Sequence, residues 1–281
     1  MRIALAQMVA GPDPQDNLAE LGGWVARAAD AGADLVVFPE ATMKAFGGSL
    51  RGVAEPLDGP WARGVAASAE EHDIVVVAGM FTPGAPGEGD RPRVRNTLLV
   101  TGRGIHDGYD KVHLFDAFGF QESRTVEQGE APCSVSVPAR AGGGTVMGLT
   151  VCYDVRFPAL YTALAEAGAT THVVAASWQD GPGKLEQWRL VCRARAIDTG
   201  SWVLACGQAV PADPAARRSA APTGVGHSMV VDPVGMVVAE LGKEPGLLVH
   251  DIDPGLAAAT RRELPVLANR VADLPAVRRL A

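Results

Sequence analysis

The stretch from Gly144 to Pro158 constrains the fold more strongly than any other. Its first half, Thr145 to Val151, is an apolar and β-branched run, which is typical of a strand buried on both faces of a sheet. Cys152 follows this run directly, and Pro158 suits the first turn of a helix. The sequence therefore predicts a buried strand, then a tight turn that carries a thiol, then a covering helix.

Segments with strand and helix patterns alternate through the first and middle thirds of the chain. Hydrophobic runs with proline or glycine boundaries predict a hairpin at residues 227–241 and strands at residues 2–8, 34–40, 74–81, 94–101, 171–178, 202–208 and 247–252. Helices are predicted to begin at Pro14, Pro60, Pro158 and Gly183. No break in composition marks a domain boundary. We therefore expect one α/β domain over residues 1–281, with sheets covered by helices.

Two segments lack a regular pattern. Ile105 to Asp116 mixes aromatic and charged residues with neither a helical nor a strand period, so we expect it to be irregular. Irregular segments of this composition often carry functional groups. Pro211 to Gly224 is a long loop rich in proline and alanine, which is either a mobile lid or a plain surface excursion.

Composition and charge narrow the class of protein. The chain has 281 residues, of which 47% are hydrophobic, enough for a sizeable core. Its net charge of −7 argues against nucleic-acid binding, because phosphates require a basic surface. No apolar run reaches the length of a membrane span, and the N-terminus lacks a signal-peptide pattern. Four scattered cysteines suggest a reducing compartment. We expect a soluble cytoplasmic protein with no nucleic-acid or membrane partner.

Three reactive side chains stand where predicted strands or turns end. Glu40 follows the second strand, Lys111 lies at the centre of the irregular segment, and Cys152 follows the buried run. Glu40 alone is weak evidence for a function, because most acidic residues that follow strands are loop residues that reach water. Cys152 alone is equally well explained as a buried structural cysteine, the commonest state of a free thiol in proteins.

Together, these side chains would make a complete set for acyl transfer if the sheets bring them to one place. Cys152 would be the nucleophile, and Glu40 would take its proton, pass it to the leaving amine and then activate water. Lys111 and the backbone N–H of Tyr153 would stabilise the oxyanion. This chemistry needs no metal and no cofactor, and no clustered His or Cys spacing suggests zinc.

Three motifs make the chain resemble the carbon–nitrogen hydrolases of the nitrilase superfamily, in the order and spacing of that family. They are Phe38-Pro-Glu40, Tyr109-Asp-Lys-Val-His-Leu-Phe-Asp116 with Gln121-Glu-Ser123, and Cys152-Tyr-Asp-Val-Arg-Phe-Pro158. The resemblance covers essentially the whole chain. It implies an α/β fold of the nitrilase type, a four-layer α-β-β-α sandwich that pairs into homodimers through its outer helices. It also implies a general base at Glu40, an oxyanion stabiliser at Lys111, a nucleophile at Cys152 and a second active-site glutamate at Glu122, which positions Lys111 or the substrate.

Within the superfamily, the Cys-Tyr-Asp motif is similar to the amidase branch that includes omega-amidases and deaminated-glutathione amidases, whereas true nitrilases carry Cys-Trp-Glu. The resemblance implies that Arg156 holds a substrate carboxylate; a salt bridge to Asp154 or a contact at the sheet edge is the alternative. Residues 179–186 depart from the Thr-Gly step of that branch, and the large Trp178 suggests an altered pocket floor. Tyr153, Arg156 and Trp178 are therefore the candidate substrate-binding residues.

The motifs predict a hydrolase that cleaves the C–N bond of a small linear amide, such as one bearing a carboxylate, through a cysteine thioester and releases ammonia or an amine. An N-carbamoyl or nitrile hydrolase of the same superfamily is the alternative within the enzyme class, and an acyltransferase is a third option. A non-catalytic scaffold or binding member of the fold would not need to retain Glu40, Lys111, Glu122 and Cys152 together. The expected partners are a small-molecule substrate and further copies of the chain, in a homodimer or a higher homo-oligomer.

Overall fold

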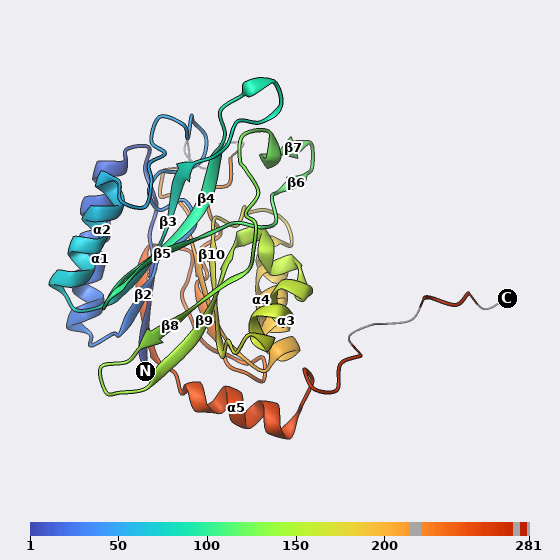
Figure 1. Cartoon of the computed structure of the whole chain (residues 1–281). Helices are drawn as coiled ribbons and strands as arrows, with labels where there is room; N and C mark the ends of the chain where they lie inside the picture. Colours follow the sequence, from blue (N-terminus) through green and yellow to red (C-terminus); the bar gives the residue numbers. More distant parts are fainter. Residues whose placement is uncertain (214–220, 272–275, 280–281) are drawn as a thin grey trace.

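The computed structural model describes residues 1–213, 221–271 and 276–279 of the chain (Figure 1). Within these ranges, two six-stranded sheets pack face to face, and two helices cover the outer face of each sheet. The α-β-β-α sandwich predicted from the sequence is confirmed.

The first sheet has the strand order β14-β1-β2-β3-β4-β5. Strands β1, β2 and β3 run parallel, and the other pairs are antiparallel. The parallel strands are joined by helices on the outer face, α1 (Pro14–Asp30) and α2 (Pro60–Glu71). The strands are β1 (Arg2–Gln7), β2 (Leu35–Val37), β3 (Val75–Pro83), β4 (Val94–Gly102), β5 (Ile105–Asp110) and β14 (Gly246–Asp251).

The second sheet has the strand order β13-β12-β11-β10-β9-β8, with β9, β10 and β11 parallel. Helices α3 (Pro158–Glu166) and α4 (Lys184–Thr199) connect these parallel strands and cover them. The two sheets therefore repeat one β-α-β-α-β arrangement. The strands are β8 (Cys133–Pro138), β9 (Gly144–Val151), β10 (Thr171–Ala176), β11 (Trp202–Gly207), β12 (Met229–Val231) and β13 (Val237–Glu240).

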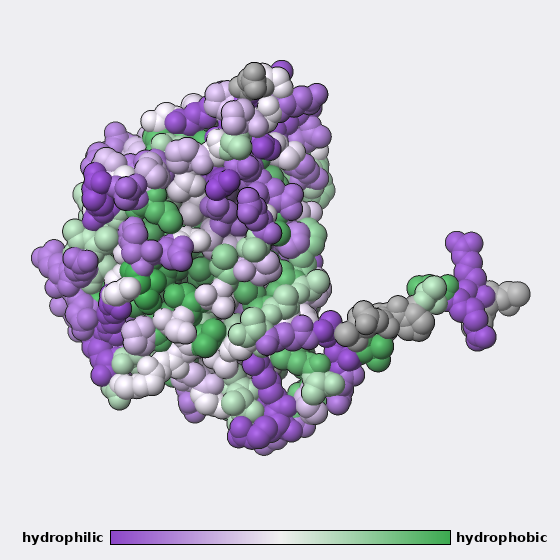
Figure 2. Space-filling model, in the orientation of Figure 1, coloured by the Kyte–Doolittle hydropathy of each residue, from purple (hydrophilic) through white to green (hydrophobic). Residues whose placement is uncertain are grey.

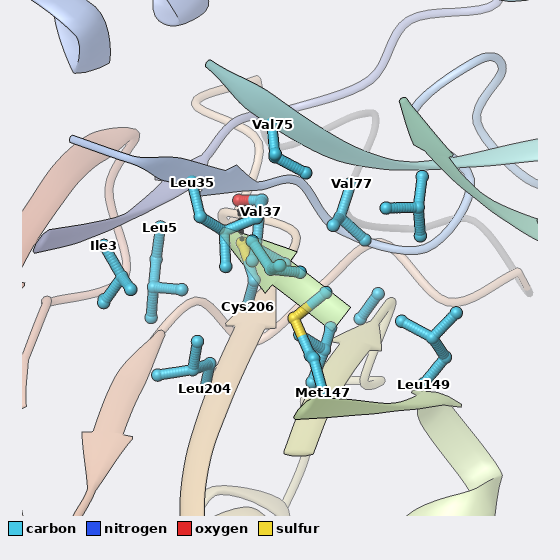
Figure 3. Close-up of a cluster of buried hydrophobic side chains, with 14 of the residues drawn as sticks. Ile3, Leu5, Leu35, Val37, Val75, Val77, Met147, Leu149, Leu204 and Cys206 are labelled. Carbon is cyan, nitrogen blue, oxygen red and sulfur yellow. Dashed lines mark hydrogen bonds between the residues drawn. The ribbon is translucent and has the colours of Figure 1, made fainter. Parts of the chain in front are cut away.

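Apolar side chains from the inner faces of both sheets form the central core. Figure 3 shows side chains of the first sheet facing those of the second, with Leu35 and Val37 on one side and Met147, Leu204 and Cys206 on the other. The opposite faces of the same strands pack against the helices. The central strands are thus buried on both faces, which explains why their sequences are continuous hydrophobic runs without alternation.

Local signals set the start of the first helix as the sequence predicts. The Asp13 side chain accepts a hydrogen bond of 2.7 Å from the Gln15 N–H, and Pro14 occupies the first turn. Helix α4 ends at Thr199 and is capped by Gly200, which adopts a left-handed backbone conformation with φ of 57°.

Part of the predicted organisation was wrong or incomplete. Ile105–Asp110 is the regular strand β5 and not an irregular segment; it pairs with β4 and, in the described part of the chain, has no strand on its other side. Its partly exposed faces explain why it lacks a hydrophobic run. Strand β8 and helix α5 (Pro254–Glu263) were not predicted. Residues 214–220 of the long proline-rich loop lie outside the described residues.

The hydropathy of the surface differs between regions of the molecule. Figure 2 shows hydrophilic residues over the layer of α1 and α2, and apolar residues in the middle of the same face, where Figure 1 places β5 and β8 at the edges of the two sheets. Among the described residues, no helix is both long and apolar enough to cross a lipid bilayer.

Candidate active site

Glu40 follows β2, and the backbone that carries it lies directly against β3. The Phe38 N–H donates to Val77 O, and the Gly79 N–H donates to Pro39 O. A Cβ atom at Gly79 would come within 2.6 Å of the backbone nitrogen of Ala41. Glycine at this position therefore permits the close approach that places Glu40 inside the protein.

Three donors fix the buried carboxylate of Glu40. Its Oε1 accepts hydrogen bonds from Asn96 Nδ2 at 2.8 Å and from Lys111 Nζ at 3.1 Å. Its Oε2 accepts from the backbone N–H of Ser177 at 2.9 Å. Asn96 belongs to the first sheet, whereas Ser177 follows β10 of the second, so the carboxylate bridges the two sheets.

Lys111 follows the last residue of β5, and its ammonium is enclosed by carboxylates. Its backbone N–H donates to Asn96 O at 2.9 Å, which extends the pairing of β5 with β4 by one residue. Its Nζ lies 3.0 Å from Oε2 of Glu122 as well as 3.1 Å from Oε1 of Glu40. Glu122 is in turn held by the Phe115 N–H at 2.6 Å. The structure therefore brings together three of the side chains predicted from the sequence.

Cys152 begins a 3₁₀ turn, Cys152–Arg156, at the end of β9. Its φ of 48° lies in the left-handed region, where a residue with a Cβ is strained by about 1–3 kcal/mol. The thiol lies close enough to both Glu40 and Lys111 for their charges to act on it. All four residues predicted to carry the chemistry thus meet at one place.

Charge and burial decide the protonation of the thiol. Burial raises the pKa of Cys152 well above its usual value, and the Glu40 carboxylate raises it further, whereas the Lys111 ammonium lowers it. At neutral pH the thiol therefore keeps its proton until a base removes it. A base is consequently required beside Cys152 for it to act as a nucleophile.

The ammonium, by contrast, keeps its charge. Burial alone would lower the pKa of Lys111, but the carboxylates of Glu122 and Glu40 outweigh that effect and raise it well above the usual value. Lys111 is therefore a permanent positive charge in a site from which water is largely excluded. Such a charge stabilises a developing oxyanion far better than it would in bulk water.

The candidate substrate-binding residues lie around the nucleophile turn. The Tyr153 ring packs edge-on between Phe115 and Phe157, at 5.0 Å and 5.1 Å between ring centroids. The Arg156 guanidinium lies 4.7 Å above the Trp178 ring. Aromatic side chains and one guanidinium therefore flank the turn that carries Cys152.

Arg156 and Trp178 have further contacts that define their positions. Arg156 donates to Gln187 Oε1 at 2.9 Å, and in the described part of the chain it makes no salt bridge with Asp154, so the predicted pairing with Asp154 is wrong. Trp178 is 5% exposed, packs against Trp188 and donates through Nε1 to a backbone carbonyl at 3.0 Å.

The sequence did not single out Asn96 or Ser177. Asn96 stands inside the hydrophobic strand β4 and is buried, and a polar side chain in such a run is a signal that could have been used. Ser177 contributes only its backbone N–H to Glu40, and no side-chain pattern could have revealed that contact.

The other cysteines lie away from this cluster. Burial raises the pKa of Cys192 and Cys206, and it also raises that of the partly exposed Cys133. Within the described residues, no group of three or more His, Cys, Asp or Glu side chains is arranged to hold a metal ion.

The chain matches the carbon–nitrogen hydrolase family over residues 2–262. A protein of Mycobacterium tuberculosis named as a hydrolase is 54% identical over 277 residues, covering 96% of this chain and 95% of the relative. The deaminated glutathione amidase of Escherichia coli O157:H7 is 30% identical over 275 residues, covering 96% of this chain and 97% of that enzyme. The omega-amidase of mouse is 31% identical over 284 residues, with 97% and 96% covered.

Solved structures give the same result. An amidase from Nesterenkonia sp. AN1, in a glutamate-to-glutamine variant with the acetamide moiety of fluoroacetamide added covalently at its active-site cysteine, has a TM-score of 0.76 at 28% identity, covering 97% of this chain and 94% of that one. The nitrilase-superfamily protein Nit3 of Saccharomyces cerevisiae also has a TM-score of 0.76 at 28% identity, covering 95% and 94%. This chain therefore belongs to the carbon–nitrogen hydrolase family, and it is an amidohydrolase of the amidase branch of the nitrilase superfamily.

Proposed function

We propose that this enzyme hydrolyses the C–N bond of a small linear amide through a thioester on Cys152. One observation carries the proposal: the Lys111 ammonium is hydrogen-bonded to both Glu40 and Glu122 beside the Cys152 thiol. This arrangement supplies a nucleophile, a base and a fixed positive charge, which are the groups that acyl transfer requires.

In the first half of the reaction, Glu40 takes the proton of the Cys152 thiol as the sulfur attacks the carbonyl carbon of the amide. The carbonyl π electrons move to oxygen, and the oxyanion is stabilised by the Lys111 ammonium and the Tyr153 N–H. When the oxyanion collapses, the C–N bond breaks. The amine leaves with the proton from Glu40, and the acyl group remains on sulfur as a thioester.

In the second half, water replaces the amine. Glu40 takes a proton from the water as its oxygen attacks the thioester carbon, and the same donors stabilise the second oxyanion. Collapse breaks the C–S bond, the sulfur regains the proton from Glu40, and a carboxylic acid leaves. The enzyme returns to its starting protonation, so the cycle consumes only amide and water.

Glu122 serves a different purpose from Glu40 in this scheme. It contacts Lys111 through both oxygens, at 3.0 Å and 3.2 Å, and it is anchored by the Phe115 N–H. Glu122 therefore holds the ammonium and keeps it charged, which leaves Glu40 to exchange protons. A buried ion pair fixed by additional hydrogen bonds suits this positioning task.

For the substrate, we propose an amide that carries a carboxylate. Arg156 stacks on Trp178 beside the nucleophile turn, and a planar guanidinium held in this way suits bidentate binding of a carboxylate. Its hydrogen-bond partner, Gln187, is neutral, so a substrate carboxylate could replace it. Trp178 would form the floor of the pocket, and Tyr153 would contact the acyl chain with its ring. Two relatives of this chain are named as amidases, in line with an amide substrate.

Intact-protein mass spectrometry during an ammonia-release assay tests the proposal. Matched amides, nitriles and N-carbamoyl compounds should be offered, each in an acidic and a neutral form. We expect ammonia from the acidic amides and a transient acyl adduct that is absent from a Cys152→Ala variant. Turnover of only the nitriles or only the N-carbamoyl compounds would assign the corresponding alternative activity. Transfer of the acyl group from the adduct to an added amine would indicate an acyltransferase. If neither an adduct nor ammonia forms, the result would favour a non-catalytic scaffold.

We also propose that the enzyme is a homodimer formed through its second helical layer. Exposed apolar residues gather on α4 and on the β12–β13 hairpin, and a Cβ at Gly235 of the hairpin would touch Ile197 of α4, so these residues form one continuous surface. A patch of this kind marks an interaction surface. Light scattering should give the mass of a dimer, and a charged residue at this surface should reduce that mass. The patch consists of Leu190, Ile197, Val234, Met236 and Val238.

A further inference from the structure

We infer that Asp154 is a positioning residue that fixes the segment carrying Lys111 against the turn carrying Cys152, and that Tyr109 is its main partner. Asp154 itself touches no reacting atom in the proposed reaction; it acts through Lys111. The inference rests on the proposed function, because it assigns Asp154 a task in that chemistry.

The two groups that Asp154 would align come from different layers. Lys111 follows β5, the last strand of the first sheet, and Cys152 follows β9 of the second sheet. Within the described residues β5 pairs on one side only, with β4, so the backbone pairing of the first sheet alone does not set the distance from Lys111 to Cys152. A contact between the sheets must do so.

Asp154 is rigidly attached to the nucleophile turn. It lies two residues after Cys152, is completely buried, and accepts the Val151 N–H through Oδ2 at 2.9 Å. This hydrogen bond joins the two ends of the turn from Val151 to Asp154, which contains Cys152. Any group bound to Asp154 has a defined place relative to the thiol.

Three further hydrogen bonds reach from the lysine segment to the same carboxylate. Tyr109 donates its hydroxyl to Oδ2 at 2.8 Å, and His113 donates its backbone N–H to Oδ1 at 3.0 Å, with its ring Nδ1 at 2.8 Å from the same oxygen. The Tyr109 hydroxyl also accepts the Val112 N–H at 3.2 Å. Tyr109 and His113 stand two residues before and two residues after Lys111, so the carboxylate holds Lys111 from both sides.

Burial and stacking make this connection stiff. Burial raises the pKa of Tyr109, and the Asp154 carboxylate raises it further, so the tyrosine remains a hydrogen donor at any working pH. The His113 ring stacks on Phe157 at 3.7 Å with an angle of 8° between the planes. Phe157 follows the nucleophile turn, so this ring contact joins the same two segments.

The chemistry of Asp154 also argues for a specific role. Among the described residues, no lysine or arginine side chain forms a salt bridge with it, although a buried carboxylate is costly without compensation. Four hydrogen bonds from backbone, phenol and imidazole groups provide that compensation. A neutral side chain would fill this space at lower cost, whereas an ionised carboxylate can accept from donors on both segments at once.

The test compares Tyr109→Phe with Tyr161→Phe. Both tyrosines are fully buried and hydrogen-bonded, but the Tyr161 hydroxyl bonds to Thr150 of β9, and among the described residues no hydrogen bond joins it to Asp154 or to the lysine segment. We expect Tyr109→Phe to lower kcat about 10-fold and Asp154→Asn about 100-fold with KM little changed, because small displacements of positioned groups cost this much. Tyr161→Phe should lower the melting temperature as much as Tyr109→Phe and leave kcat unchanged.

A second readout separates positioning from general loss of structure. The rate at which fluoroacetamide labels Cys152, measured by intact mass, should fall in Tyr109→Phe, Asp154→Asn and Lys111→Met. If Asp154 and Tyr109 act through Lys111, adding Tyr109→Phe to Lys111→Met should reduce the rate no further. Multiplicative losses in the double variant, or equal losses of kcat in Tyr109→Phe and Tyr161→Phe, would overturn the inference. If the wild-type protein is labelled but hydrolyses no amide, the proposed function is refuted. The labelling rates of the variants, compared with that of the wild type, would still test whether Asp154 and Tyr109 position Lys111.

Discussion

The backbone N–H of Ser177 lies 2.9 Å from Oε2 of Glu40, although 137 residues separate the two in the sequence. Glu40 stands at the end of β2 in one sheet, and Ser177 stands at the end of β10 in the other. The contact orients one oxygen of the carboxylate, while Lys111 and Asn96 orient the other. The proposed base is therefore held by both halves of the sandwich, and its position depends on how the sheets pack.

Replacing the nucleophile should abolish turnover with little effect on folding. In a Cys152→Ala variant the thiol is lost, and only a small, partly buried group is removed. We expect no measurable amide hydrolysis and a melting temperature close to that of the wild type. Cys133→Ala is the matched control, because it removes a partly exposed thiol outside the site. Wild-type turnover by Cys152→Ala would exclude Cys152 as the nucleophile.

Glu40→Gln should separate thiolate formation from catalysis. Burial and then the Glu40 carboxylate raise the pKa of Cys152, so removal of that negative charge should lower the pKa of the thiol. Turnover should nevertheless fall by about 10²-fold or more, because the base is lost. The pKa of the thiol is measured from the pH dependence of thiolate absorbance, after the absorbance of the Cys152→Ala variant is subtracted. Turnover is measured by ammonia release. An unchanged thiol pKa would contradict the proposed contact.

Lys111→Met should impair both catalysis and stability. The kcat should fall by roughly 10²-fold, because the charge beside the oxyanion is lost. Two buried carboxylates, Glu40 and Glu122, would lose their shared cation, which typically costs about 3–5 kcal/mol. Urea unfolding should show this loss at neutral pH. It should become smaller as the pH falls, because protonation then removes the unpaired charges.

Arg156→Ala should discriminate between substrates. If the guanidinium binds a substrate carboxylate, kcat/KM should fall by about 10-fold or more for acidic amides and hardly change for neutral amides of the same length. Arg189→Ala is a suitable control, because Arg189 pairs with Glu186 and Glu240 and, among the described residues, its guanidinium does not stack on Trp178 as that of Arg156 does. Equal losses with both kinds of amide would indicate that Arg156 is structural.

His172 should make the protein sensitive to acid. Its ring is fully buried against Tyr161, no hydrogen-bond partner for it lies in the described part of the chain, and burial lowers its pKa from 6.5 to about 3. Between about pH 3 and pH 6.5, His172 therefore binds a proton in the unfolded chain but not in the folded protein. Stability should fall by about 1.4 kcal/mol per pH unit from this group as the pH drops below 6.5.

A His172→Leu variant should lose that part of the pH dependence, which urea midpoints measured between pH 5 and pH 7 would show. His250→Leu serves as the control, because His250 lies on an edge strand and is partly exposed. Identical slopes for the wild type and His172→Leu would mean that His172 does not contribute.

Much of the fold could be predicted because its signals are local. The runs that became β1, β3, β9, β10 and β11 are buried on both faces, and their hydrophobic sequences carry that information directly. Proline at the first turn of a helix located α1, α2 and α3. Strand β5 was missed because it lies at the edge of a sheet, where partial exposure removes the hydrophobic pattern.

The sequence by itself determined which groups could carry the chemistry, since Glu40, Lys111, Glu122 and Cys152 stand in recognisable motifs. Only the tertiary structure decided their geometry. The Ser177 N–H donates to Glu40 and the Tyr109 hydroxyl donates to Asp154, and both hydrogen bonds join residues of different sheets that are far apart in the sequence. Such contacts exist only once two sheets have packed face to face. The packing of the whole core sets their distances, and no local pattern of residues encodes them.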